Sequence, residues 1–283
     1  MELIRAAADL RAATDAWRDA DARVGLVPTM GALHEGHAAL MRAARETCDR
    51  VGVSIFVNPL QFGDPGDLEA YPRDEAADLA FCASEGVDAV WVPPVDQVYP
   101  PGADLVAPDP GPVGETFEGA SRPGHFAGVL TVVHRLFDVV GPSTSFFGEK
   151  DAQQLFLVRR MVAELAMPIQ VVAVPTVREP DGLALSSRNA RLAPAEREQA
   201  GCLFLALTEA AALARAGERD AAVLVAAMAR EIGATPLARL DYAAVVDEAT
   251  FQPVVTLGAP ARAIVAAAFP SARLIDTLAL PEG

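Results

Sequence analysis

The chain has 283 residues, of which 52% are hydrophobic, and it carries a formal net charge of −15. A chain of this length forms one large domain or, more often, two, and its acidic balance argues against nucleic-acid binding, which needs a basic surface. No apolar run approaches the roughly 20 residues of a membrane span, and the first residues lack the apolar region of a secretory signal, so we expect a soluble cytoplasmic protein without a membrane partner.

Strand-like and helical patterns alternate up to about residue 175. The predicted strands are residues 23–27, 51–57, 89–92, 145–147 and 169–174. The predicted helices are residues 37–48, 73–84, 126–140 and 152–165. Such alternation predicts an α/β fold in which helices cover both faces of a parallel sheet. The Pro/Gly-rich stretch 93–114 is predicted to be an excursion from this part of the chain.

The order of predicted elements changes after residue 175, where helices precede short strands. The predicted helices there are residues 194–216 and 221–232, and the predicted strands are residues 240–246, 262–268 and 273–280. This order indicates a smaller α+β domain. We therefore predict one domain over residues 1–176 and a second over residues 177–283.

The segment 28–37 follows the predicted strand 23–27 and leads into the predicted helix 37–48. It contains two of the four histidines in the chain. Backbone N–H groups and the positive end of the helix dipole converge at such a junction, which favours anions. His34 and His37 are three residues apart and share a face in a first helical turn. Gly31 and Gly36 let a bulky group approach the backbone. This arrangement suits a nucleotide triphosphate; the alternative is a pair of capping or solvent-facing histidines.

Further polar residues follow later strands, at the edge where parallel sheets bind ligands. Segment 56–62 supplies the amides of Asn58 and Gln61, which can hold a hydroxyl or a carboxylate. Segment 147–154 contains Lys150, the only lysine of the chain. A lysine is a compact point charge that suits phosphate, unlike the planar arginine fork. The rarity of lysine in an arginine-rich chain favours a chemical requirement at this position.

Two more segments complete the set. Segment 183–189 is a predicted flexible loop with two hydroxyls and a guanidinium, all suited to phosphate, and segment 122–128 reads Arg-Pro-Gly-His-Phe-Ala-Gly. The H-x-G-H run at 34–37 resembles the signature of a nucleotidyltransferase superfamily with Rossmann-like folds. The five segments in this order resemble the pantoate–β-alanine ligase family.

The resemblance implies a Rossmann-like parallel-sheet domain that binds ATP and pantoate, a smaller C-terminal α+β lid domain, and a homodimer. The family joins pantoate to β-alanine with ATP and Mg²⁺. The pantoate carboxylate attacks the α-phosphorus to give pantoyl adenylate and pyrophosphate, and the β-alanine amine then displaces AMP. Neither the metal ligands nor the β-alanine site is assigned by the resemblance.

The resemblance also implies roles for individual residues. The implied catalytic residues are His34, His37, Lys150 and Arg188, with His37 as proton donor. The implied ATP-binding residues are Met30, Gly31, His34, Gly36, His37, Gly148, Lys150, Asp151, Val177, Leu185, Ser186, Ser187 and Arg188. The implied pantoate-binding residues are Gln61, Gln154 and Met30. Ala152 and Leu185 depart from the family pattern, which has Phe or Tyr and Met there.

Simpler explanations remain open for single residues. Gln154 could be a solvated amide, Asp151 a helix N-cap, and Ser186 with Ser187 an ordinary loop. Two other functions remain open for the whole chain. One is an H-x-G-H enzyme that moves a nucleotidyl group onto a phosphate ester and leaves the adenylyl group on its product. The other is a non-catalytic ATP sensor, which shows no pyrophosphate exchange.

Overall fold

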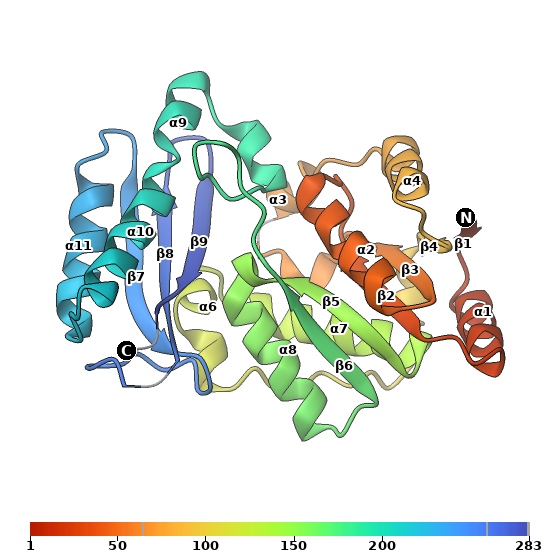
Figure 1. The fold of residues 1–283 in the computed structure, drawn as a ribbon. Coiled ribbons are helices and arrows are strands. Elements are labelled where there is room, and N and C mark those ends of the chain that lie inside the picture. The colour runs from red at the N-terminus through yellow and green to blue at the C-terminus, as the bar shows by residue number, and fades with distance from the viewer. Residues whose placement is uncertain (64, 259, 282–283) are drawn as a thin grey trace. The chain divides into compact units, whose positions relative to one another are not determined.

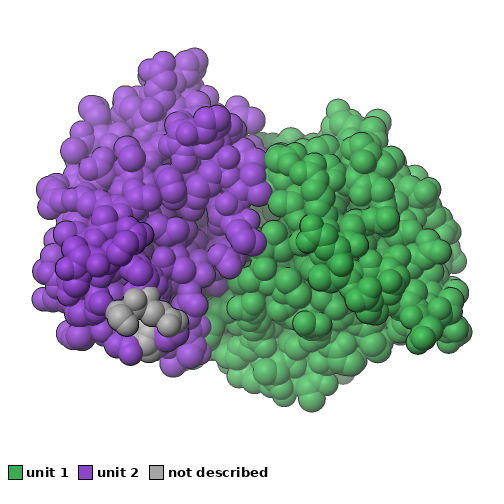
Figure 2. All heavy atoms as spheres, viewed as in Figure 1, with its two compact units in different colours: residues 1–148, 153–174 green, residues 149–152, 175–283 purple. Residues whose placement is uncertain are grey.

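The computed structural model describes residues 1–63, 65–258 and 260–281 (Figure 1). The chain forms two compact units (Figure 2). Unit 1 comprises residues 1–148 and 153–174, and unit 2 comprises residues 149–152 and 175–283. The division into domains at residues 176 and 177 stays a prediction, because compactness does not establish independent folding.

Unit 1 is built on a six-stranded parallel sheet with the strand order β1-β4-β3-β2-β5-β6. The strands are β1 (Glu2–Ile4), β2 (Val24–Thr29), β3 (Arg50–Ile55), β4 (Ala89–Trp91), β5 (Ser143–Gly148) and β6 (Ile169–Val174). All are short and joined by helical crossovers, as parallel pairing requires. The predicted parallel sheet is confirmed, and β1 is an additional strand at its edge.

Helices cover both faces of this sheet. The helices of this part of the chain are α1 (Ala7–Asp19), α2 (Glu35–Thr47), α3 (Pro65–Glu69), α4 (Glu75–Ser84), α5 (Val95–Val98), α6 (Glu118–Ser121), α7 (His125–Val140) and α8 (Ala152–Glu164). Helix α2 packs on β2, β3 and β5, whereas α1 packs against α7 on the other side of β2. In the described part of the chain, no helix is long and apolar enough to cross a membrane.

The strand order reverses at β2. The chain proceeds from β2 through β3 to β4 on one side and later adds β5 and β6 on the other side. Strands β2 and β5 therefore pair directly, with Gly25 opposite Thr144 and Leu26 opposite Ser145. In sheets of this kind, ligands bind in the crevice beyond the carboxyl ends of the two strands at the reversal. We therefore expect the residues that follow β2 and β5 to contribute to a ligand-binding site.

Unit 2 contains a three-stranded antiparallel sheet, β7 (Arg239–Asp247), β8 (Ala261–Ala268) and β9 (Arg273–Ala279). Helices α10 (Cys202–Arg215) and α11 (Ala221–Gly233) pack on it and form an alanine-rich core with it. The predicted smaller α+β part is confirmed in these elements.

The single helix predicted over residues 194–216 is wrong. The chain forms α9 (Pro194–Gln199) and then α10, with a break at Ala200 and Gly201. Glycine has a low helix propensity, and a Cβ at Gly201 would lie 3.2 Å from the backbone oxygen of Asp181. The break therefore occurs where another segment of the chain comes close to the helix backbone.

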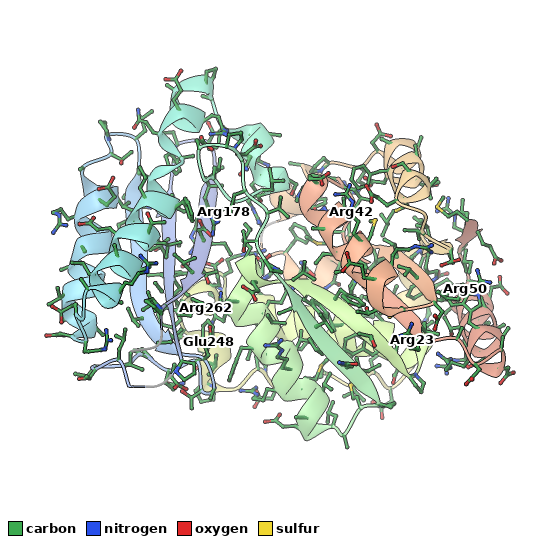
Figure 3. All side chains as sticks on the ribbon, in the orientation of Figure 1. Arg23, Arg42, Arg50, Arg178, Glu248 and Arg262 are labelled. Carbon is green, nitrogen blue, oxygen red and sulfur yellow. The ribbon has the colours of Figure 1, made fainter. Side chains whose placement is uncertain are left out.

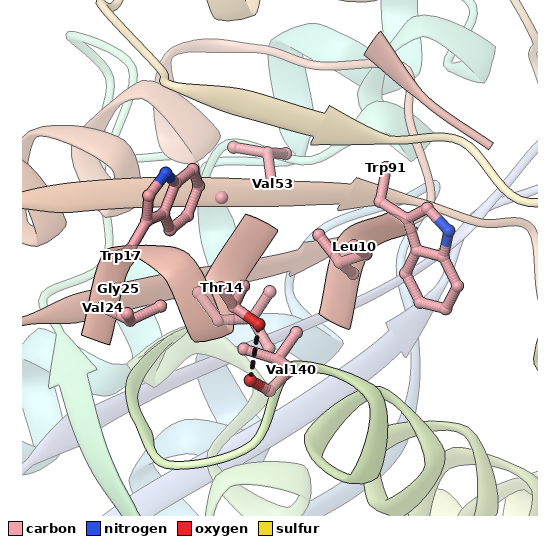
Figure 4. Close-up of a pocket in the computed structure, with 10 residues that line it drawn as sticks. Leu10, Thr14, Trp17, Val24, Gly25, Val53, Trp91 and Val140 are labelled. Carbon is pink, nitrogen blue, oxygen red and sulfur yellow. Dashed lines mark hydrogen bonds between the residues drawn. The ribbon is translucent and has the colours of Figure 1, made fainter. Parts of the chain in front are cut away.

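A small apolar cavity lies between α1 and the sheet (Figure 4). Its lining includes Leu10, Trp17 and Trp91, and the hydroxyl of Thr14 donates to the backbone oxygen of Val140 beside it (3.0 Å). A side chain at Gly52 on β3 would meet only backbone oxygens, at 3.9 Å and beyond, so there is room for a methyl group.

We expect Gly52→Ala to raise the free energy of unfolding by about 0.5–1 kcal/mol, because alanine costs less chain entropy than glycine in a strand and fills part of the cavity. Gly25→Ala on β2 is the matched control. Its Cβ would lie 3.2 Å from both Cβ and Sγ of Cys48, so it should destabilise by crowding. Denaturant unfolding of both variants measures the difference; a shift of both in the same direction would contradict the cavity argument.

Candidate active site

The two histidines at the start of α2 cap the helix reciprocally. The backbone N–H of Gly36 donates to Nδ1 of His34 (3.1 Å), and the backbone N–H of His34 donates to Nδ1 of His37 (3.2 Å). The ring centroids lie 4.2 Å apart. Because both Nδ1 atoms accept, each neutral imidazole carries its proton on Nε2. The two histidines thus cap the helix, as the simpler alternative has it, and Nε2 is the donor atom of each neutral ring.

Asp78 on α4 holds the turn that precedes these histidines. Its carboxylate oxygens accept from the backbone N–H of Ala32 (3.0 Å) and of Leu33 (2.8 Å), and its side chain is buried at 5% exposure. Gly31 has φ +82°, and a Cβ there would lie 2.7 Å from Oδ2 of Asp78. This turn therefore requires glycine at position 31 for its φ and for the Asp78 carboxylate, and an ATP contact at Gly31 stays a prediction.

Asn58 is a buried scaffold residue and not a substrate amide. Its Nδ2 donates to Oε1 of Gln61 (3.1 Å) and to the backbone oxygen of Gly128 (3.0 Å). Its Oδ1 accepts from the backbone N–H of Leu60 (3.1 Å) and from the hydroxyl of Tyr99 (2.7 Å). With 1% exposure and four hydrogen bonds, the amide has no capacity left for a ligand. Tyr99 comes from the predicted excursion 93–114, which thus returns to the site.

Gln61, by contrast, keeps a replaceable contact. Its Nε2 donates to Sδ of Met30 (3.1 Å), and a thioether is a weak acceptor. A better acceptor, such as a hydroxyl or carboxylate oxygen, can take over that N–H. The turn that carries Gln61, η1 (Pro59–Gln61), packs directly on α7, because a Cβ at Gly128 would lie 2.2 Å from the oxygen of Leu60.

The neighbouring residues Gln153 and Gln154 on α8 differ sharply. Gln153 is buried, donates to the backbone oxygens of Val113 (2.7 Å) and Thr116 (2.9 Å), and accepts from the N–H of Glu118 (3.1 Å). The half-buried Gln154 makes no side-chain hydrogen bond to any described residue. Of these two residues, only Gln154 therefore has its full amide available.

Lys150 and Asp151 lie in unit 2, in the turn η3 (Glu149–Asp151) that follows β5. The Nζ of Lys150 lies 3.8 Å from Oδ1 of Asp151, and the lysine side chain is 15% exposed. Gly148 ends β5, and a Cβ on this glycine would meet no described atom within 4 Å. This turn thus presents a largely buried cation next to an open stretch of backbone.

A second segment of unit 2 forms an ordered turn. The backbone N–H of Leu185 donates to the oxygen of Val177 (3.0 Å), and the N–H of Arg188 donates to Oγ of Ser186 (3.3 Å). Nδ2 of Asn189 donates to the oxygen of Ala184 (3.0 Å). The predicted residues of this segment are all half-buried: Val177, Leu185, Ser186, Ser187 and Arg188.

The predicted site residues thus fall into two sets. Unit 1 contains Met30, Gly31, His34, Gly36, His37, Gln61, Gly148 and Gln154. Unit 2 contains Lys150, Asp151, Val177, Leu185, Ser186, Ser187 and Arg188. The structure brings His34 to His37 and Met30 to Gln61 in the first set, and Lys150 to Asp151 and Val177 to Leu185 in the second. The supporting residues Asp78 and Tyr99 were not predicted from the sequence, because their isolated positions carry no motif.

A family model described as pantoate-beta-alanine ligase matches residues 2–279 of the chain. A curated relative from Rubrobacter xylanophilus, named pantothenate synthetase, is 51% identical, and the match covers 99% of this chain and 98% of the relative. A relative of the same name from Rhizorhabdus wittichii is 52% identical, with 99% of each chain covered. The likeness thus extends over the whole sequence.

Solved structures agree with these matches. The crystal structure of pantothenate synthetase from Thermus thermophilus matches with a TM-score of 0.92 and 47% identity, covering 99% of this chain and 100% of that one. The pantoate-beta-alanine ligase of Francisella tularensis, crystallised with beta-gamma ATP and beta-alanine, matches with a TM-score of 0.79 and 31% identity, covering 99% and 97%.

We expect Asp78→Asn to destabilise the protein by about 1–3 kcal/mol, because it replaces one of the two accepting oxygens with an NH2 donor that faces a backbone N–H. Amide hydrogen exchange at Ala32 and Leu33 should accelerate. The control is Asp74→Asn on the same helix, where the side chain caps α4 by accepting from the N–H of Ala77. Asparagine caps as well as aspartate, so this variant should behave like the wild type. Equal exchange at Ala32 and Leu33 in both variants would show that Asp78 does not hold the turn.

Proposed function

The chain belongs to the pantoate–β-alanine ligase family, and from that premise we propose that it condenses pantoate with β-alanine in an ATP-dependent, AMP-forming reaction. The observation that carries this proposal is the reciprocal capping of His34 and His37, which places the proton of each neutral ring on Nε2 at the positive end of α2. That helix begins beyond β2, where the strand order reverses. A triphosphate fits both the charge and the donors of such a helix start.

The proposed reaction has two steps. In the first, a pantoate carboxylate oxygen attacks the α-phosphorus of ATP, the bond from that phosphorus to the bridging oxygen breaks, and pyrophosphate leaves with the electron pair. In the second, the β-alanine amine attacks the acyl carbon of pantoyl adenylate. A C–N bond forms, the C–O bond to AMP breaks, and the amine loses a proton.

Catalysis in this proposal rests on electrostatics. Negative charge develops on the departing pyrophosphate, and fixed donors aimed at that charge lower the barrier. His34 and His37 would supply Nε2–H donors, with His37 as the donor to the leaving group. Lys150 and Arg188 would supply positive charge. Ser186 and Ser187 would donate hydroxyl hydrogen bonds to the phosphates.

The ribose and adenine of ATP would contact other residues among those implied to bind ATP. Asp151 can accept from both ribose hydroxyls, next to Gly148, whose open backbone permits close approach. The carbonyl of Val177 accepts from Leu185 and retains a second lone pair for the adenine edge. Met30, Gly31, Gly36 and Leu185 would complete the ATP contacts.

Pantoate would bind through amides. Gln61 would exchange its weak bond to Met30 for a pantoate oxygen, and Gln154 would add a second amide. Asn58 would hold Gln61 in place. An amide fixed in a buried position discriminates strongly for a substrate that pairs with it.

We propose that ATP binds together with Mg²⁺, since this ion is commonly bound through substrate phosphates and one or two carboxylates. No group of three or more His, Cys, Asp or Glu side chains in the described residues is arranged to hold a metal ion. The family also leads us to propose a cytoplasmic homodimer, whose oligomeric state sedimentation of the purified protein tests.

Pantoate-dependent exchange between ATP and labelled pyrophosphate, without β-alanine, tests the proposal. Exchange supports adenylate formation, and release of AMP on adding β-alanine supports the second step. An enzyme that transfers a nucleotidyl group onto a phosphate ester would show no pantoate dependence, and an ATP sensor would show binding without exchange. Either result would overturn the proposed function.

We expect Lys150→Ala to slow the exchange by about 10- to 100-fold or more, since a charge-assisted contact contributes about 1.5–3 kcal/mol. Lys150→Arg should also be impaired, because the planar fork does not replace a point charge. Arg159→Ala, at an exposed cation on α8, is the control and should leave the rate unchanged. Normal exchange in either Lys150 variant would remove this residue from the mechanism.

Gln154→Ala should raise the KM for pantoate more than the KM for ATP and leave the melting temperature close to that of the wild type. Gln153→Ala is its neighbour and contrast, because loss of three hydrogen bonds should lower the melting temperature. Steady-state kinetics and thermal unfolding of both variants check this. Equal effects of Gln154→Ala on both KM values would contradict a role in pantoate binding.

A further inference from the structure

Asp276 and Thr277 are neighbouring residues of β9, and each contacts an arginine. Through these two arginines they hold the two candidate ATP-binding segments of unit 2. Adjacent residues of a strand point to opposite faces of its sheet. Asp276 lies opposite Val265, on the face covered by the alanine-rich core, and Thr277 lies opposite Ile264 on the other face. Asp276 binds Arg178, and Thr277 binds Arg262. Figure 3 labels the two arginines.

Arg178 fastens the segment that carries Ser186 and Arg188. Its guanidinium donates to both oxygens of Asp276, from Nη1 to Oδ2 (2.6 Å) and from Nη2 to Oδ1 (3.0 Å). Nη1 also donates to the backbone oxygen of Gly182 (3.0 Å), and the guanidinium lies 4.0 Å from the ring centre of Phe204. Asp276 is 2% exposed. A bidentate pair this well satisfied fixes the turn that leads into Ser186.

Arg262 fastens the turn that carries Lys150. Its Nη1 donates to Oγ1 of Thr277 (3.0 Å), its Nε donates to Oε1 of Glu248 (3.0 Å), and its Nη2 lies 3.6 Å from Oε2 of Glu149. The arginine side chain is 13% exposed, and the turn η3 packs along β9. Glu149 is the residue next to Lys150, and its carboxylate pairs with Arg262 and not with the lysine.

We propose that Arg262 is a positioning residue: it holds the turn Glu149–Asp151 on β9 and keeps the Glu149 carboxylate from pairing with Lys150, so that the lysine charge is available to a triphosphate. The role of Lys150 in this inference rests on the proposed function. The charge balance supports the assignment. Without Arg262, the carboxylates of Glu149 and Glu248 would lose their shared cation, and the nearest remaining positive charge on the turn would be Lys150 itself.

The test uses Arg262 and leaves Asp276 intact, because removing one partner of a buried ion pair can unfold the protein. We expect Arg262→Gln to weaken Mg-ATP binding and slow pantoate-dependent exchange by about 10- to 100-fold, as small displacements of a reacting group do. The pantoate KM should stay close to that of the wild type. Arg273→Gln is the matched control, an arginine of the same sheet that pairs with Asp241. It should leave ATP binding unchanged.

A double variant separates positioning from general damage. Glu149→Gln in the Arg262→Gln background removes the carboxylate that would compete for Lys150, so it should restore part of the ATP affinity. No recovery in the double variant, or equal ATP affinities in Arg262→Gln and Arg273→Gln, would overturn the proposal. Titration calorimetry with Mg-ATP reports these affinities even if the wild type shows no exchange, so failure of the proposed function and failure of this inference are distinguishable.

Discussion

The exchange of hydrogen bonds between His34 and His37 at the start of α2 is the constraint on which the candidate site depends. Each Nδ1 accepts a backbone N–H, which satisfies donors that a helix start leaves without partners. The same bonds fix the tautomer, because a ring that accepts through Nδ1 must carry its proton on Nε2. Protonation of either Nδ1 would remove an acceptor and uncap the helix. The helix cap and the position of the ring protons are therefore two consequences of one arrangement.

Two buried amides behind the site are saturated with hydrogen bonds, whereas the two amides proposed to bind pantoate are not. Asn58 and Gln153 use their amides fully within the protein. Gln61 keeps only a weak bond from Nε2 to Met30, and the Gln154 amide makes none to the described residues. A buried amide with all partners in place holds its neighbours rigidly. An amide with a weak partner forms a stronger hydrogen bond when a better acceptor binds. The hydrogen-bond pattern thus separates supporting residues from binding residues that sequence alone groups together.

The sequence predicted the α/β fold and the positions of most elements, because apolar periodicity reports burial directly. It did not predict β1 or α1; α1 (Ala7–Asp19) buries only Leu10 and Thr14. The break at Gly201 was missed because its cause is the approach of Asp181 from elsewhere in the chain. Distance in sequence also hid Asp78, whose partners are Ala32 and Leu33, and the bonds of Asn58 to Gly128 and Tyr99.

The C-terminal sheet does more than pack against its own helices. Because side chains alternate along β9, the adjacent residues Asp276 and Thr277 can each serve a different face. Burial raises the pKa of the Asp276 carboxyl, and the charges of Arg178 and Lys150 oppose that rise. The turn that carries Lys150 packs on the same strand that binds Arg178, before Ser186. A one-residue slip in the register of β9 would exchange these faces and detach both segments at once. The pairing of β8 with β9 therefore fixes the relative placement of Lys150 and the serine segment within unit 2, although neither residue belongs to the sheet.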